Sequence, residues 1–118
     1  MTKRYEMKAE YLDKWLAQLR SQQAEQTRNG HYLENLGESA RTYAESRIEN
    51  GKPVCGCAIG QFAAANPDVS FFPGGDINLG HGSVMDQDLQ TEMIRLNDYT
   101  HATFEDIAAW LEASVERV

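Results

Sequence analysis

The sequence predicts a mainly α protein, a compact bundle of four to five helices forming one domain over residues 1–118. Apolar residues recur at spacings of three, four and seven along several segments, which is the period of an amphipathic helix. The nine Gly and three Pro of the chain fall mostly between those segments. At about 66–85, Gly and Pro are too frequent for a helix and predict a Gly-rich loop or a short β-hairpin.

The first two helices are expected over residues 5–27 and 31–49. Asn29-Gly30 and Asn50-Gly51 follow them, and both dipeptides favour the positive φ angles of a helix C-cap. The first apolar stripe consists of Tyr5, Leu12, Trp15, Leu16 and Leu19, and the second of Leu33, Leu36, Ala40 and Tyr43.

A third helix is expected from Val54 to Ala65, ended by Asn66-Pro67. Small residues occur on two of its faces, so neighbouring helices can approach closely, and it is expected to be the central, most buried helix. In the stretch that follows, residues 69–72 and 77–79 are the segments that would pair if a hairpin forms across Pro73-Gly74-Gly75.

The last two helices are expected from about Asp86 to Leu96 and from Thr103 onward. Asn97-Asp98 closes the fourth in this interpretation. Thr103 is the expected N-cap of the fifth, with Asp106 at its third position. The inward stripe of this helix is expected to comprise Phe104, Ile107, Ala108, Leu111, Val115 and Val118, with Ala102 and Ile107 at the hydrophobic-staple positions.

Charge is distributed unevenly along the chain, whose net charge is −7. Residues 1–59 carry nine Lys or Arg and eight Asp or Glu, whereas residues 60–118 carry two and ten. No basic residue occurs in the 42 positions between Lys52 and Arg95. This imbalance argues against direct nucleic-acid binding, because phosphates would be repelled. It favours either simple solubility or a surface matched to a basic partner.

The partner-binding interpretation assigns a docking face for a host protein with a basic surface. The residues expected to form it are Asp76, Asp86, Asp88 and Glu92. No run of about 18 apolar residues is present, so no membrane span is expected. No secretion signal is apparent and only two Cys occur, which favours a cytoplasmic protein in a reducing compartment. A homodimer remains open.

Three short motifs resemble a set of uncharacterised small proteins from phages, prophages and some bacteria. They are Cys57-Ala58-Ile59-Gly60, Leu96-Asn97-Asp98, and the helix that runs from Phe104 to Glu112. The resemblance covers roughly residues 54–113. It implies an accessory protein of a phage or mobile element, and it carries over no catalytic residue. Together with the stretch that lacks basic residues, it favours an inhibitor of a host nucleic-acid-binding or defence complex.

Metal binding and nucleophilic catalysis are the two chemical roles that the cysteines could have. Zinc would need Cys55, Cys57, His81 and His101, but the spacing is unlike that of zinc knuckles, and two Cys on one helix would point about 200° apart. A thiolate at Cys55 or Cys57, with His81 or His101 as base and Asp98 orienting it, is allowed by residue type. Buried packing is the favoured interpretation of both cysteines.

Neither calcium nor phosphate has a fitting motif. Asp76-x-Asn78-x-Gly80 begins like a calcium loop, but His81 and Gln87 occupy the positions where an EF-hand needs Gly and Glu. The Gly-rich segments lack a neighbouring base for phosphate. No cofactor or metal is therefore expected. The alternative to an interaction protein is a small enzyme or ligand-binding protein, with a pocket between the Cys55-Cys57 helix and the Gly-rich loop.

Overall fold

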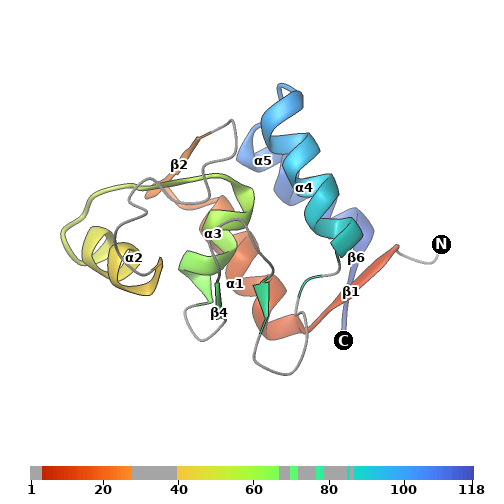
Figure 1. The fold of residues 1–118 in the computed structure, drawn as a ribbon, viewed down its shortest axis with the longest axis horizontal. Coiled ribbons are helices and arrows are strands. Elements are labelled where there is room, and N and C mark those ends of the chain that lie inside the picture. The colour runs from red at the N-terminus through yellow and green to blue at the C-terminus, as the bar shows by residue number, and fades with distance from the viewer. Residues whose placement is uncertain (1–3, 28–39, 67–69, 72–76, 79–84, 86) are drawn as a thin grey trace.

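The computed structural model describes residues 4–27, 40–66, 70–71, 77–78, 85 and 87–118. Within these ranges the chain forms five helices, which confirms the mainly α class. They are α1 (Ala9–Leu19), α2 (Ala40–Glu49), α3 (Ala58–Ala65), α4 (Gln87–Tyr99) and α5 (Phe104–Ser114). In Figure 1, α1 and α3 occupy the middle of the molecule, α2 lies to the left, and α4 and α5 lie to the right.

Three pairs of short strands join segments of the described chain. Strand β1 (Tyr5–Met7) pairs in parallel with β6 (Val115–Arg117), and β2 (Ala24–Gln26) pairs in parallel with β3 (Val54–Gly56). Strands β4 (Ser70–Phe71) and β5 (Ile77–Asn78) pair antiparallel, as the hairpin interpretation of this stretch requires. The glycines between and after β4 and β5 lie outside the described residues.

The two parallel pairs correct the predicted ends of three helices. The helix expected over 5–27 is only α1, because β1 precedes it and β2 follows it. The helix expected from Val54 begins at Ala58, since residues 54–56 form β3. Val115 and Val118 do not extend the α5 stripe: Val115 is buried in β6, and Val118 is 64% exposed. In each case the partner strand lies far away in the sequence, where local periodicity cannot reveal it.

Two further boundaries differ from expectation. Helix α4 continues through Asn97 and Asp98 to Tyr99, so the prediction that Asn97-Asp98 closes this helix is wrong. The second predicted helix is described only as α2, and its residues 31–39 lie outside the described residues. The start of α5 is confirmed. Thr103 accepts a hydrogen bond from the Asp106 backbone, and the Asp106 side chain accepts one from the Thr103 backbone, which is a capping box.

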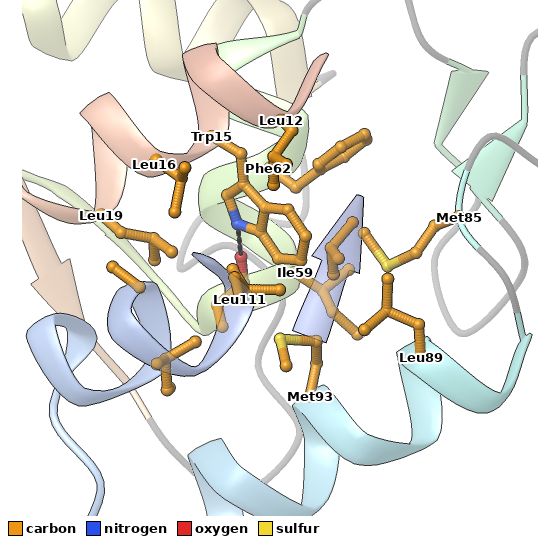
Figure 2. Packing of buried hydrophobic residues seen from close by; sticks show 14 of the residues in the cluster. Leu12, Trp15, Leu16, Leu19, Ile59, Phe62, Met85, Leu89, Met93 and Leu111 are labelled. Carbon is orange, nitrogen blue, oxygen red and sulfur yellow. Dashed lines mark hydrogen bonds between the residues drawn. The ribbon is translucent and has the colours of Figure 1, made fainter. Parts of the chain in front are cut away.

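Helix α3 is the centre of the core, as its small residues predicted. Seven of its eight residues are buried. It packs against α1, α2 and α4, while α1 also packs against α5. Figure 2 shows side chains of α1, α4 and α5 meeting those of α3 in one core. The largest fully buried side chains include Leu12, Trp15, Ile59, Phe62, Met85, Leu89, Met93, Ile107 and Leu111.

Trp15 connects α1 to α3 in two ways. Its ring meets the Phe62 ring edge-on, with 5.0 Å between centroids. Its Nε1 donates a hydrogen bond of 2.9 Å to the Ala58 carbonyl oxygen in the first turn of α3 (Figure 2). Both the indole and Ala58 are fully buried. The indole therefore fills core volume and also satisfies a buried backbone acceptor.

Replacing Trp15 with Phe tests this double role. The substitution leaves a cavity and removes the indole hydrogen bond to the Ala58 carbonyl, so the free energy of unfolding should fall by about 2–4 kcal/mol. Tyr99→Phe is the matched control, because Tyr99 is 80% exposed, and it should change stability by less than about 0.5 kcal/mol. Urea unfolding measures both. Equal small effects for the two variants would contradict the assignment.

Candidate functional site

A buried polar cluster lies where the N-terminus of α3 meets α4 and β2. Its central side chain is Asn97, which is 1% exposed. Asn97 Oδ1 accepts hydrogen bonds of 3.1 Å from the Ala58 backbone N–H and from Gln26 Nε2. Its Nδ2 donates to the Thr27 carbonyl at 2.8 Å and to Asp98 Oδ1 at 2.7 Å. Every hydrogen-bonding position of this amide is therefore used.

The cluster supplies partners for backbone groups that a helix start leaves unsatisfied. The Ala58 N–H is in the first turn of α3 and has no acceptor within its own helix, so Asn97 takes that role from another helix. Gln26 Nε2 also donates to the Ala102 carbonyl at 3.1 Å, just before α5. The cluster thus joins β2, α3, α4 and the start of α5 through side-chain amides.

Cys57 is the N-cap of α3, and its Sγ accepts a hydrogen bond of 3.4 Å from the Gly60 N–H. The thiol is buried, and desolvation raises its pKa to about 11, with the negative charge of Asp98 adding to the rise. The thiol is therefore protonated at neutral pH. A protonated, buried thiol is a poor nucleophile, so this geometry favours packing and capping over catalysis.

Cys55 lies in a different environment from Cys57. It is buried in β3, where its Sγ donates to Glu25 Oε2 at 3.5 Å and accepts from Arg47 Nη2 at 3.9 Å. Cys57 belongs to the main core cluster and Cys55 does not. The prediction that both cysteines are buried is confirmed, although they lie on a strand and at a helix cap and not along one helix.

The other chemical candidates are not assembled in the described part of the chain. Across residues 4–27, 40–66 and the described residues beyond them, no three or more His, Cys, Asp or Glu side chains form a group that could hold a metal ion. His101 is exposed. His81, Asp76 and the glycines of the suggested phosphate nest lie outside the described residues. The Gly-rich side of the pocket suggested between the Cys55-Cys57 segment and the Gly-rich loop also lies outside the described residues.

The predicted docking face is described at two of its four residues. Asp88 lies exposed in the first turn of α4, and Glu92 follows it one turn later. Glu92 pairs with Arg95, with 2.8 Å between its Oε2 and the guanidinium Nη2, and this hydrogen bond lowers the pKa of the Glu92 carboxyl. The charge of Arg4 lowers that pKa further. Asp76 and Asp86 lie outside the described residues.

Two acidic side chains of α5 form ion pairs with a basic residue from the first half of the chain. Arg20, at the end of α1, pairs with both Glu105 and Glu112. Arg117 of β6 pairs with Asp13 of α1 at 2.6 Å. The two Arg20 pairs thus offset part of the acidity on α5.

Comparison of the chain with protein families, with curated proteins and with solved structures finds no match. The structure does bring the three resemblance motifs together: the Ala58 N–H bonds to Asn97, while Ile59 and Leu111 lie in one core against which Leu96 packs. In the described ranges no helix is both long and apolar enough to cross a membrane.

The sequence predicts Asn97 only as a local helix end and predicts no role for Gln26. The two side chains hydrogen-bond to each other although they are 71 positions apart in the sequence. The sequence does contain a signal for the role of Asn97, because it is a polar residue that falls on the inward apolar stripe of its helix. Leu89, Met93 and Asn97 are four residues apart and all buried, so Asn97 continues the buried stripe of α4.

Asn97→Asp tests whether the amide at this position is required. At pH 7 the carboxylate would lose both donated hydrogen bonds and place a buried negative charge beside Asp98, so stability should fall by about 3–5 kcal/mol. Burial and Asp98 both raise the folded-state pKa of the new carboxyl above its unfolded value. The penalty should therefore shrink as the pH falls through that raised pKa.

Urea unfolding at neutral and mildly acidic pH, always relative to the parent protein, measures this dependence. Asp98→Asn is the control, because it retains an oxygen that can accept from Asn97 Nδ2. If Asn97→Asp matches the parent at pH 7, the amide network carries no stability and its assignment is wrong.

The raised pKa of Cys57 predicts a specific loss of stability in alkaline solution. The unfolded thiol ionises near pH 9.0, but the folded thiol stays neutral up to about pH 11. Stability is therefore lost as the pH rises through this window, by at most about 3 kcal/mol. Cys57→Ser keeps an acceptor for the Gly60 N–H and does not ionise there, so its stability should fall less. If the free energy of unfolding changed with pH in the same way for the parent protein and for Cys57→Ser, the burial of a neutral thiol would be contradicted.

Proposed function

We propose that this chain is an interaction protein that binds a basic partner through the solvent face of α4. The proposal includes an origin as a phage or mobile-element accessory protein, which the three motifs at 57–60, 96–98 and 104–112 favour. Its partner would be a host protein whose basic surface ordinarily contacts nucleic acid. Acidic side chains on α4 would then occupy a surface that attracts phosphates.

The observation that carries the proposal is the pairing of the few cations in the second half. Residues 60–118 contain ten Asp or Glu but only two basic residues, Arg95 and Arg117. Both guanidinium groups are engaged in ion pairs, with Glu92 and Asp13 respectively. A partner that approaches this half therefore meets a surplus of carboxylates, and the cations present are already partnered.

The face of α4 that points to solvent has a regular arrangement. Asp88, Glu92, Arg95 and Tyr99 are spaced by four, three and four residues, which places them along one side of the helix. We call these four residues the α4 outer stripe. Tyr99 is 80% exposed at its end. Exposed tyrosines are common anchors in protein interfaces, and a basic partner can place a guanidinium against the ring.

The catalytic alternative receives no comparable support. Cys57 is protonated and its sulfur is used to cap α3. Asp98, the suggested orienter of a catalytic His, instead accepts a hydrogen bond from Asn97. The residues that nucleophilic chemistry would use thus serve the packing of α3 against α4.

Charge reversal on the stripe tests the proposal. Asp88→Lys with Glu92→Lys should weaken binding to an arginine- and lysine-rich peptide by roughly tenfold, equivalent to about 1.4 kcal/mol. Glu45→Lys with Glu49→Lys is the matched control. It makes the same charge change at the same spacing on exposed residues of α2, which lies on the opposite side of the molecule (Figure 1). This control should retain binding nearly in full.

Titration calorimetry over a series of salt concentrations measures both variants. Binding should weaken as salt rises, because the attraction is screened. Equal weakening by the two double variants would show that only net charge matters and would reject α4 as the docking face. Binding that is insensitive to salt would reject the electrostatic basis.

A further inference from the structure

Helix α2 ends in a turn that two main-chain hydrogen bonds close. Gly51 follows its last turn with φ +67°, in the left-handed region that favours glycine. The Gly51 N–H donates to the Ile48 carbonyl at 3.1 Å, and the Lys52 N–H donates to the Arg47 carbonyl at 2.8 Å. This pair of bonds is a Schellman motif with Asn50 at the C-cap. We call residues 47–52 the α2 C-cap turn.

Asn50 and Gly51 are both accessible within this turn. Asn50 is exposed, and its Nδ2 donates to the Ser46 carbonyl at 2.7 Å. A Cβ added to Gly51 would meet no atom within 4 Å other than those of its chain neighbours, so the space on that side of Gly51 is open. With no side chain at position 51, the backbone nitrogen of Gly51 has little steric protection on the side of the Asn50 amide.

We propose that Asn50-Gly51 is a site of spontaneous deamidation and isoaspartate formation. The Gly51 nitrogen attacks Asn50 Cγ, a C–N bond forms, and the side-chain nitrogen leaves as ammonia while the Gly51 N–H proton is lost to solvent. Water then opens the resulting five-membered imide at one of its two carbonyls. Opening at one gives Asp at position 50, and opening at the other gives isoaspartate. This inference is independent of the proposed function.

The turn sets the rate of the first step. The attacking nitrogen donates to Ile48 and the leaving amide donates to Ser46, so the turn must open before the ring can close. Ile48, Glu49 and Asn50 are all exposed, and a helix end of this kind opens locally without global unfolding. An opening cost of one or two kcal/mol corresponds to a slowing of roughly 5- to 30-fold relative to the unfolded chain.

The product would not fit the turn that produced it. Isoaspartate adds a methylene to the main chain between Asn50 and Gly51, so the two Schellman hydrogen bonds could no longer form together. Either product also places a carboxylate beside the last carbonyls of α2, where negative charge is unfavourable. Arg47 Nε bonds to the Pro53 carbonyl at 2.7 Å, so the change would lie next to the link between α2 and β3.

The full-length chain, incubated in mildly alkaline buffer with and without denaturing urea, provides the test. Peptide mapping by mass spectrometry and enzymatic methylation of isoaspartate report the conversion at each Asn. Asn50→Gln is the matched variant, because the six-membered ring it would need forms far more slowly. Asn97, buried and followed by Asp98, is the internal control in the native protein. The peptide that contains Asn29-Gly30 is quantified separately.

Conversion at Asn50 in the native protein, at a rate no more than about 30-fold below that in urea, is the expected result. It should be absent in Asn50→Gln, and Asn97 should remain unmodified. No conversion at Asn50, or a slowing beyond about 30-fold, would overturn the proposal, since the α2 C-cap turn would then not open locally at the low cost that the proposal requires. Signal that persists in Asn50→Gln would overturn the assignment to this residue.

Discussion

The fold depends on burying an eight-residue helix on almost every side. Helix α3 has neighbours in α1, α2 and α4, and its first turn lies out of reach of solvent. A buried helix start needs partners for its backbone N–H groups, and a buried carbonyl needs a donor. Asn97 and Cys57 accept from the Ala58 and Gly60 N–H groups, and the Trp15 indole donates to the Ala58 carbonyl. Helices α1 and α4 must therefore both be in place before α3 can be central.

Local signals in the sequence predicted what local interactions determine. The capping box at Thr103 and Asp106, the buried stripe of α1, and the small-residue character of α3 all follow from spacing alone, and all are confirmed. The parallel pairs β1–β6 and β2–β3 were missed. Their strands are three residues long and pair with segments distant in the chain, so neither alternation nor turn chemistry marks them. The role of Asn97 could not be predicted for the same reason, because three of its four hydrogen-bond partners come from β2, α3 and the segment after β2 and only Asp98 comes from its own turn.

The buried amides specify one arrangement more strictly than apolar side chains of equal size would. An apolar residue at position 97 would tolerate small rotations of α4, whereas Asn97 requires two donors and two acceptors at fixed positions. Gln61 acts similarly on the other side of α3, since it is fully buried, donates to the Val54 carbonyl and accepts from Gln18. Two amide contacts thus set the position of α3 along its axis, and the apolar core fills the remaining volume.

Repulsion among the carboxylates of residues 60–118 acts against this packing, and ion pairs reduce this repulsion at particular places. Arg20 holds Glu105 and Glu112 of α5, and Arg117 ties β6 to Asp13 of α1. Each exposed pair contributes little stability alone. Their placement still matters, because they bring cations of one half against carboxylates of the other along α1 and α5. On α4, Glu92 pairs with Arg95 of the same helix. Arg20 therefore reduces repulsion on α5, which packs against α1, while the exposed Asp88 carboxylate of α4 acts on whatever approaches from solvent.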